Sequence, residues 1–216
     1  RDNFGFGWGT LDWHELIDRD DVDVVDITAP NALHQEIAEA AAAAGKHIFC
    51  EKPMANSVAE ARRMVERAER ERVALGVHHF IRFTRFAPAL REFAAIHGLG
   101  EPVALQVEGG AGCLLTNRLH WIDFASTLFG APPRRVVSTA RAKPINPRSP
   151  DLMLYGGTAI WSFADGREAV ISLNEHSSLT LSARIYFRDA VVEVDKGVER
   201  ICDRVILLRR GEVSAV

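Results

Sequence analysis

A chain of 216 residues can bury a sizeable core, either as one large domain or as two small ones. Its 47% hydrophobic and 25% charged residues are typical of globular proteins, and its net charge of −3 argues against nucleic acid as a partner. The longest apolar run, residues 40–44, is too short to span a membrane, and from the first residues given we expect no signal peptide. Three widely spaced cysteines favour reduced thiols and a cytoplasmic location over a disulfide framework.

The chain opens with a glycine-rich stretch, residues 5–10 (GFGWGT), followed by a short predicted helix over residues 12–17. A dinucleotide-binding domain usually starts with a strand and a glycine-rich turn that holds the pyrophosphate. Because no strand precedes this stretch, we interpret it as a loop. We therefore expect the chain to begin part-way through such a domain.

The residues that follow alternate between strand and helix patterns. Short runs rich in apolar and β-branched residues predict strands over residues 22–28, 47–50 and 73–79. Apolar residues at helical spacing predict a helix over residues 31–45, and the Ser-x-x-Glu capping box at Ser57 opens another helix that runs to about residue 70. This alternation is typical of a doubly wound parallel sheet, an α/β fold of the Rossmann type.

Two short motifs follow consecutive predicted strands. Ala29-Pro30-Asn31 comes after the first strand and Glu51-Lys52-Pro53 after the second. Ligands of doubly wound sheets bind outside the carboxyl ends of the strands. We therefore expect both motifs on the same rim, at a ligand site.

After residue 80 the pattern changes from alternating elements to runs of strands. Helices are predicted over residues 88–96 and 114–129, and strands over residues 103–108, 135–140, 158–163, 168–174, 180–187, 191–194 and 205–208. Asp165-Gly166 is typical of a hairpin turn between two of them. We expect a mostly antiparallel open sheet backed by the long helix, in a C-terminal α+β domain over residues 81–216 that follows a partial Rossmann domain over residues 1–80.

Four segments together resemble the glucose–fructose oxidoreductase/inositol dehydrogenase family. The paired motifs lie within residues 24–34 (VVDITAPNALH) and 45–53 (GKHIFCEKP), and residues 85–89 (RFAPA) and 120–123 (HWID) also look like the family. The resemblance implies a dinucleotide-binding domain and a second domain that carries substrate contacts. It also implies NAD or NADP as cofactor, a sugar, cyclitol or related polyol as substrate, and a homo-oligomer formed through the C-terminal sheet.

The resemblance also assigns roles to individual residues. It implies Lys52 and His120 as catalytic residues, with cofactor contacts from Ala29, Pro30, Asn31, His34, Glu51 and Lys52. Substrate contacts are expected from Lys52, Arg85, Thr116, His120 and Asp123. Relatives often carry an aspartate at the position of Thr116, and a threonine can orient a hydroxyl group but cannot act as a base near neutral pH.

Hydride transfer from an alcohol leaves a proton to be removed, and Lys52 is the predicted base. A lysine is a poor base in water, but partial burial beside an oxidised nicotinamide would favour its neutral form. The alternative interpretation of Lys52 is a surface lysine in a turn. Arg82 and Arg85, near the domain junction, could bind substrate or form a salt bridge between the domains.

The long predicted helix presents two faces when each residue turns the chain by about 100°. Thr116, His120 and Asp123 fall within roughly 60° of one another, and we expect them to face a cleft. A separate apolar stripe that includes Leu119 and Ile122 is expected to pack on the sheet. The alternative interpretation of His120 is a structural histidine at the edge of the core, and Asp123 has an equally plausible structural role.

We expect no metal site. His78 and His79 are adjacent on a strand and should point to opposite faces, and the acidic run at residues 18–23 lacks the glycine and glutamate of a calcium loop. The prediction is an NAD(P)-dependent oxidoreductase that acts on a polyhydroxylated substrate. The alternatives are elimination or glycoside cleavage assisted by bound NAD, and a non-catalytic protein that senses cofactor or sugar.

Overall fold

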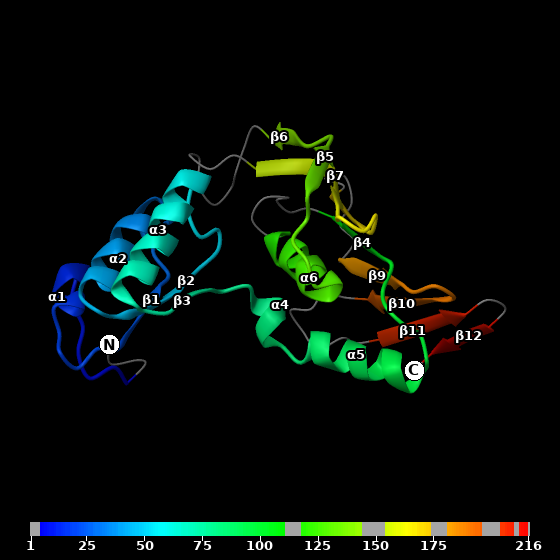
Figure 1. Cartoon of the computed structure of the whole chain (residues 1–216), viewed down its shortest axis with the longest axis horizontal. Helices are drawn as coiled ribbons and strands as arrows, with labels where there is room; N and C mark the ends of the chain where they lie inside the picture. The colour runs from blue at the N-terminus through cyan, green and yellow to red at the C-terminus, as the bar shows by residue number, and fades with distance from the viewer. Residues whose placement is uncertain are drawn as a thin grey trace. The chain divides into compact units, whose positions relative to one another are not determined.

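The computed structural model of the chain describes residues 5–110, 118–143, 154–173, 181–195, 204–209 and 212–215. The chain divides into two compact units, Arg1–His78 and His79–Val216, so the division falls two residues before the expected boundary. Figure 1 shows the N-terminal unit in blue to cyan and the C-terminal unit in green to red. None of the helices in these described ranges is long and apolar enough to cross a bilayer.

The N-terminal unit is built around a parallel sheet with the strand order β1-β2-β3. Its described elements are α1 (Trp13–Ile17), β1 (Val24–Ile27), α2 (Asn31–Ala43), β2 (His47–Cys50), α3 (Val58–Glu71) and β3 (Leu75–Val77). Helices α2 and α3 pack side by side, and α2 also packs on β1 and β2 (Figure 1). The predicted Rossmann-type alternation is confirmed.

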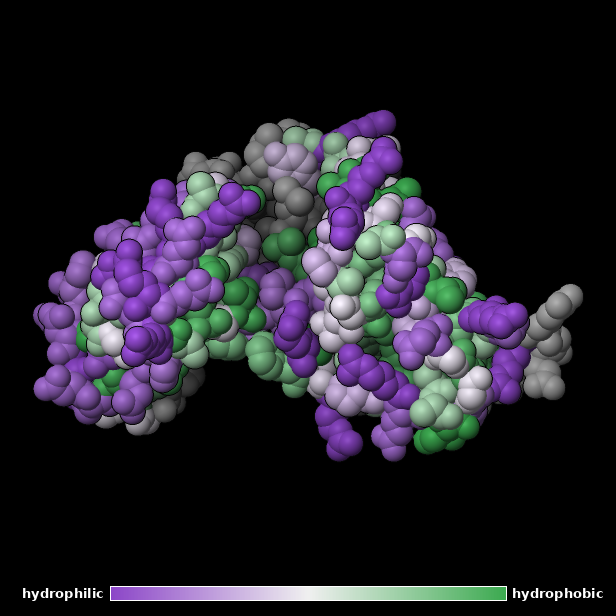
Figure 2. Space-filling view, viewed as in Figure 1, coloured by the Kyte–Doolittle hydropathy of each residue, from purple (hydrophilic) through white to green (hydrophobic). Residues whose placement is uncertain are grey.

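Helix α3 begins where the sequence predicts. The Oγ of Ser57 accepts a hydrogen bond from the backbone N–H of Glu60 over 3.1 Å, and the Glu60 carboxylate accepts one from the backbone N–H of Asn56 over 2.9 Å. These bonds satisfy donors that the first turn would otherwise leave without partners. The surface over α2 and α3 that faces the viewer in Figure 2 is mostly hydrophilic, as expected for the outer layer of such a unit.

The glycine-rich stretch forms a loop. Residues 5–10 contain no helix or strand, and the guanidinium of Arg19 stacks 4.7 Å from the ring centroid of Trp8. Helix α1 starts after this loop, where Asp12 accepts a hydrogen bond from the backbone N–H of His14 over 3.0 Å. The interpretation of this stretch as a loop before a short helix is confirmed.

The C-terminal unit is a sheet with helices against it. Its described elements are α4 (Phe80–Phe83), α5 (Phe86–Ile96), β4 (Ala104–Gly109), α6 (Leu119–Phe129), β5 (Arg135–Ser138), β6 (Arg141–Lys143), β7 (Leu154–Ser162), β8 (Glu168–Leu173), β9 (Ser182–Tyr186), β10 (Ala190–Asp195), β11 (Arg204–Arg209) and β12 (Glu212–Ala215). The described strands follow the order β12-β11-β10-β9-β4-β8-β7-β5, with β6 also paired to β7. All neighbours are antiparallel except β4 and β8, so the prediction of a mostly antiparallel sheet is confirmed.

Helix α6 packs on the sheet in part by the expected face. Ala125 and Phe129 of the predicted stripe are buried, and Ile122 is half-buried against the same core. The buried face also includes Trp121 and Phe124, which the prediction did not place there and whose large rings fill the core. Residues 114–117 of the predicted helix lie outside the described residues.

The turn between β7 and β8 follows the prediction. The backbone N–H of Phe163 donates to the carbonyl of Arg167 over 2.9 Å, and Gly166 adopts a φ of +84°, a conformation that favours glycine. Three short elements, α4, β6 and β12, were not predicted. Each has only three or four residues, too few to show a periodic pattern.

Candidate active site

Two loops leave the N-terminal sheet side by side. In the parallel pair of β1 and β2, Ile27 lies opposite Cys50, so the chain leaves both strands at the same edge. The backbone N–H of Glu51 donates to the carbonyl of Ile27 over 2.9 Å and holds the start of the second loop next to the end of β1. The expectation that Ala29-Pro30-Asn31 and Glu51-Lys52-Pro53 share one rim is confirmed.

His34, near the start of α2, ties these two loops together. Its Nε2 lies 2.8 Å from the carbonyl oxygen of Ala29, and its Nδ1 lies 3.0 Å from the carbonyl oxygen of Pro53. A neutral imidazole can donate to only one of these oxygens, whereas a protonated ring can donate to both. The side chain is 0% exposed, so in this structure His34 joins the two loops from below the surface, and its contact with a cofactor stays a prediction.

The first loop leads directly into α2. Pro30 is the N-cap residue and makes no side-chain hydrogen bond to the helix, while its carbonyl accepts a hydrogen bond from the backbone N–H of Leu33 over 2.8 Å. Pro30 is exposed, and Ala29 and Asn31 are half-buried. The first turn of this 13-residue helix carries no acidic residue, so the positive end of its dipole is not offset by an acidic side chain of that turn.

Lys52 lies in the second loop. Its backbone N–H donates to Oε2 of Glu51 over 3.1 Å, and its peptide bond to Pro53 is cis. The residue is half-buried, and no hydrogen bond or ion pair to its Nζ is formed by the described part of the chain. The ammonium group of Lys52 is therefore free to contact a ligand.

The carboxylate of Glu51 is held from two sides. One oxygen accepts from the backbone of Lys52, and the other lies 2.6 Å from Nδ1 of His78. Partial burial acts to raise the pKa of Glu51, but the hydrogen bonds from His78 and from Lys52, together with the charges of these residues, outweigh it. The net effect lowers the pKa of Glu51, so the group stays an anion near neutral pH. The sequence analysis missed the role of His78, although the end of β3 beside the end of β2 could have indicated it.

Cys50 is the last residue of β2 and is fully buried. Burial raises the pKa of its thiol to about 11, and the nearby negative charges of Glu51 and Asp26 act in the same direction. A thiol with this pKa is a poor nucleophile at neutral pH. Cys50 therefore belongs to the core below the rim and takes no part in its chemistry.

His120 occupies the first turn of α6 and is only 7% exposed. Its ring packs edge-on against Phe80, with a centroid distance of 4.3 Å, and against His79, with a distance of 5.7 Å. Most of the ring is thus enclosed within the described part of the C-terminal unit, and the expected position of His120 at a cleft stays a prediction. His120 belongs to the C-terminal unit and Lys52 to the N-terminal unit.

The remaining predicted substrate residues lie in different surroundings. Both carboxylate oxygens of Asp123 accept hydrogen bonds from Arg82, a pair that joins α6 to α4 within the C-terminal unit and raises the pKa of Arg82. This pair lies within one unit, and the predicted substrate contact of Asp123 stays a prediction. Arg85 is exposed at the start of α5, and Thr116 lies outside the described residues.

His78 and His79, which follow the end of β3, contact different partners, so they do not form a metal-binding pair. His78 contacts Glu51, whereas the ring of His79 packs against that of His120. The described ranges contain no group of three or more side chains of the types that bind metals.

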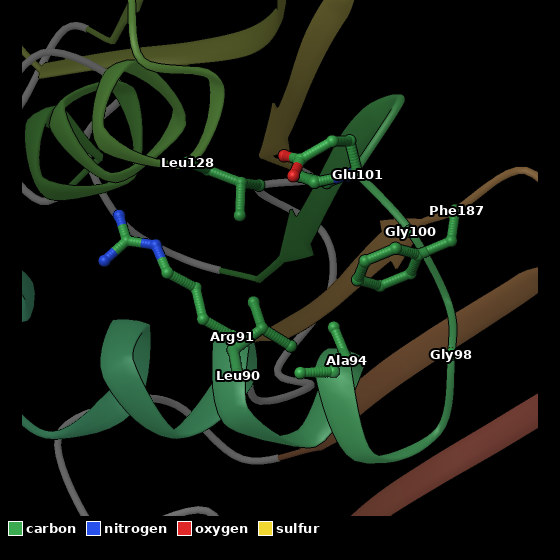
Figure 3. A pocket seen from close by; sticks show the side chains of 10 residues that line it. Leu90, Arg91, Ala94, Gly98, Gly100, Glu101, Leu128 and Phe187 are labelled. Carbon is green, nitrogen blue, oxygen red and sulfur yellow. The ribbon is translucent and has the colours of Figure 1, made fainter.

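A pocket of about 360 Å³ lies within the C-terminal unit. Arg91 and Glu101 supply its charged side chains, and Leu90, Leu128 and Phe187 supply most of its apolar surface (Figure 3). None of the predicted site residues lines it. The pocket is therefore separate from the residues predicted to carry the chemistry.

Comparison with known proteins agrees with this arrangement. A family model described as "oxidoreductase family, NAD-binding Rossmann fold" (Gfo/Idh/MocA) matches residues 3–79, a range that contains both rim loops. The N-terminal part of the chain is therefore similar to this family. The matched range ends at the boundary between the two units. It includes the motifs of Pro30 and Lys52 and does not include His120.

Curated Gfo/Idh/MocA-type relatives cover further parts of the chain. The chain is 29% identical over 176 residues to a 1,5-anhydro-D-fructose reductase of Ensifer adhaerens. This match covers 73% of the chain and 53% of the relative. The chain is 30% identical over 132 residues to a myo-inositol 2-dehydrogenase of Thermotoga maritima (55% and 40%), and 46% identical over 88 residues to a levoglucosan dehydrogenase of Pseudarthrobacter phenanthrenivorans (40% and 22%). The chain thus matches about half of the length of these relatives, or less.

Solved structures extend the likeness to both units. A levoglucosan dehydrogenase in complex with NADH and levoglucosan has a TM-score of 0.81 at 23% identity, covering 100% of this chain and 66% of that chain. A UDP-N-acetylglucosamine 3-dehydrogenase of Acidithiobacillus ferrooxidans has a TM-score of 0.75 at 23% identity, covering 96% and 67%. At this level of identity the likeness shows a shared fold.

Proposed function

We propose that the protein is an NAD(P)-dependent oxidoreductase that transfers a hydride to or from a CH–OH carbon of a sugar, cyclitol or related polyol. The observation that carries this proposal is the rim of the N-terminal sheet. There, Lys52 has an ammonium group with no partner among the described residues, in a loop that His34 ties to the loop of Pro30. The names of the relatives support the substrate class, because 1,5-anhydrofructose, levoglucosan and inositol are all polyhydroxylated rings.

The rim fits the nicotinamide half of a dinucleotide. We propose contacts from Ala29, Pro30 and Asn31 in the first loop and from Glu51 and Lys52 in the second. The α2 N-terminus without a side-chain cap and the half-buried ammonium of Lys52 offer positive groups to an anionic cofactor. When bound, the nicotinamide ring accepts or donates the hydride. In this scheme the N-terminal unit binds the cofactor and the C-terminal unit binds the substrate.

Lys52 carries the proton in the proposed mechanism. In the oxidation direction its neutral amine takes the proton of the substrate hydroxyl, while the hydride leaves the carbon that carries this hydroxyl. In the reduction direction its ammonium returns a proton to the oxygen as the hydride arrives. The carboxylate of Glu51, hydrogen-bonded to the Lys52 backbone, fixes where this loop begins.

His120 is the second proposed catalytic group, which holds the reacting oxygen by a hydrogen bond and shares the proton with Lys52. Its 7% exposure supports a ring held in one orientation by Phe80 and His79. Arg85, which is exposed, is proposed to bind substrate hydroxyl groups. Thr116 keeps its predicted role of orienting a hydroxyl, and Asp123 keeps its predicted contact with substrate.

A homo-oligomer through the C-terminal sheet is part of the same proposal. Its support is the alternation of buried and half-exposed residues in β4, β8 and β9, which leaves one face of the sheet outside the core. Sedimentation analysis of the protein tests it, and a monomer at micromolar concentration would reject it. A cytoplasmic location stays a prediction that rests on the spacing of the cysteines.

The proposed function is tested by a fluorescence titration of the full-length protein with NADH and NADPH. A screen of sugars and inositols for absorbance change at the nicotinamide band follows. Binding of one cofactor and net redox change with a polyol are the expected results. Product formation without net redox change would favour elimination or glycoside cleavage, and cofactor or sugar binding without turnover would favour a sensing protein.

A further inference from the structure

The end of β3 brings a histidine to the rim beside the Lys52 loop. β3 pairs with β2 in parallel, with Val77 opposite Cys50, so the residue after each strand emerges at the same edge (Figure 1). The backbone N–H of His78 donates to the carbonyl of Cys50 over 2.8 Å. This bond fixes the backbone of His78 next to the start of the second loop.

The side chain of His78 completes a chain of hydrogen bonds to Lys52. Its Nδ1 lies 2.6 Å from Oε1 of Glu51, and because a carboxylate can only accept, this nitrogen carries the hydrogen and donates it. The other carboxylate oxygen accepts from the backbone N–H of Lys52 over 3.1 Å. Glu51 therefore connects the imidazole of His78 to the backbone of the residue that carries the free ammonium.

Packing restricts the imidazole on a second side. The ring of Phe49 lies 5.4 Å from that of His78, centroid to centroid, at an interplanar angle of 48°. A Cβ at Gly76 would come within 3.1 Å of the Phe49 ring, so the absence of a side chain at Gly76 lets Phe49 lie in this place. His78 is thus held by its backbone, by Phe49 and by Glu51.

We propose that His78 is a positioning residue that orients the Glu51 carboxylate and, through it, the Lys52 loop for proton transfer. His34 holds the far end of the same loop at the carbonyl of Pro53, so the loop has a histidine at each end. This inference rests on the proposed function of Lys52. It adds a residue that follows a third strand and that the motifs after the first two strands do not indicate.

The kinetic test uses the full-length protein with His78→Ala, His78→Gln and a matched control, His47→Ala. His47 is an exposed histidine of the same sheet that accepts a hydrogen bond from the backbone N–H of Ala74 over 3.0 Å. Misplacing the Lys52 loop should lower kcat by about 10-fold in His78→Ala, with little change in the KM for cofactor. His78→Gln, whose amide can still donate to Glu51, should recover most of the loss, and His47→Ala should keep the wild-type kcat.

A second readout does not depend on turnover. The carboxyl carbon of Glu51 is followed by ¹³C NMR across pH, with Glu51→Gln to assign its signal. Because the His78 hydrogen bond lowers the pKa of Glu51, His78→Ala should raise that pKa and His47→Ala should leave it unchanged.

The two readouts separate failure of this inference from failure of the proposed function. An unchanged Glu51 titration in His78→Ala would overturn the role of His78, as would an equal loss of kcat in His47→Ala. A wild-type protein without nicotinamide-dependent turnover would instead overturn the proposed function, and the Glu51 titration would still decide whether His78 holds the carboxylate.

Discussion

Lys52 and His120 are held in their respective units by different kinds of interaction. Around Lys52 the fixed groups are backbone atoms and the side chains of neighbours, and the ammonium itself has no hydrogen bond or ion pair among the described residues. His120 is itself part of a packed cluster, with rings of Phe80 and His79 against its own. The loop presents a charged group without a hydrogen-bond partner among the described residues, and the helix presents a ring held by packing.

This difference predicts how each site responds to substitution. Removing the ammonium of Lys52 breaks no hydrogen bond or ion pair among the described residues and takes away only a charge interaction with Glu51, so the fold should hardly change. Truncating His120 leaves a cavity in a packed core, so function and stability should both fall. The four predictions below test this contrast, from the largest expected effect to the smallest.

Lys52→Met should lower kcat at least about 10³-fold, because it removes the only proposed proton carrier on the rim. Cofactor affinity, measured by fluorescence titration, should stay within a few-fold of wild type. The matched control is Lys46→Met, since the Nζ of Lys46 donates to the carbonyl of Arg19 over 2.7 Å and belongs to no proposed site. Turnover by Lys52→Met within a few-fold of wild type would contradict the mechanism.

His120→Gln should lower kcat by about 10²-fold, because an amide can hydrogen-bond the substrate but cannot carry a proton at neutral pH. Urea denaturation should show a smaller loss of stability than in His120→Ala, which also leaves a cavity. Phe80→Leu tests whether packing alone explains the effect. If Phe80→Leu lowers kcat as far as His120→Gln does, His120 is a structural histidine.

His34→Ala should destabilise the N-terminal unit by about 2 to 4 kcal/mol, because it opens a cavity and removes the ring that lies between the carbonyl oxygens of Ala29 and Pro53. Urea denaturation measures the loss. Gln35→Ala removes surface hydrogen bonds to Glu39 and Arg63 and should cost about 0.5 kcal/mol or less. A stability of His34→Ala equal to that of Gln35→Ala would show that the two loops do not depend on the histidine.

Arg82→Met should cost about 1 kcal/mol or less, because the arginine side chain of the Asp123 pair is 51% exposed and solvent screens the interaction. Arg85→Met removes a neighbouring exposed guanidinium that has no ion-pair partner in the described part of the chain, and it should leave thermal stability unchanged while raising the KM for substrate. Equal melting temperatures for the two variants would show that the ion pair does not hold α4 against α6.

Much of the rim could be predicted because it depends on short stretches of sequence and one rule of topology. The β-branched strand ending at Ile27, the run ending at Cys50 and the capping box at Ser57 each lie within a few consecutive residues. Neighbouring parallel strands end at the same edge, so the loops of Pro30 and Lys52 had to meet once the strands were recognised. The change to a mostly antiparallel sheet could also be predicted, because after residue 80 the sequence changes from alternating strand and helix patterns to runs of strands.

The burial and the partners of individual side chains depended on the tertiary structure. His34 meets Pro53 across 19 residues of sequence, Glu51 meets His78 across 27, and Arg82 meets Asp123 across 41. No periodic pattern relates residues so far apart. The motif that contains His34 is compatible both with a histidine that contacts a ligand and with one that is buried beneath it. The sequence by itself determined that Lys52 and Pro30 lie on one rim. Only packing decided that His34 lies under that rim, that His78 reaches Glu51, and that His120 is largely enclosed by aromatic rings.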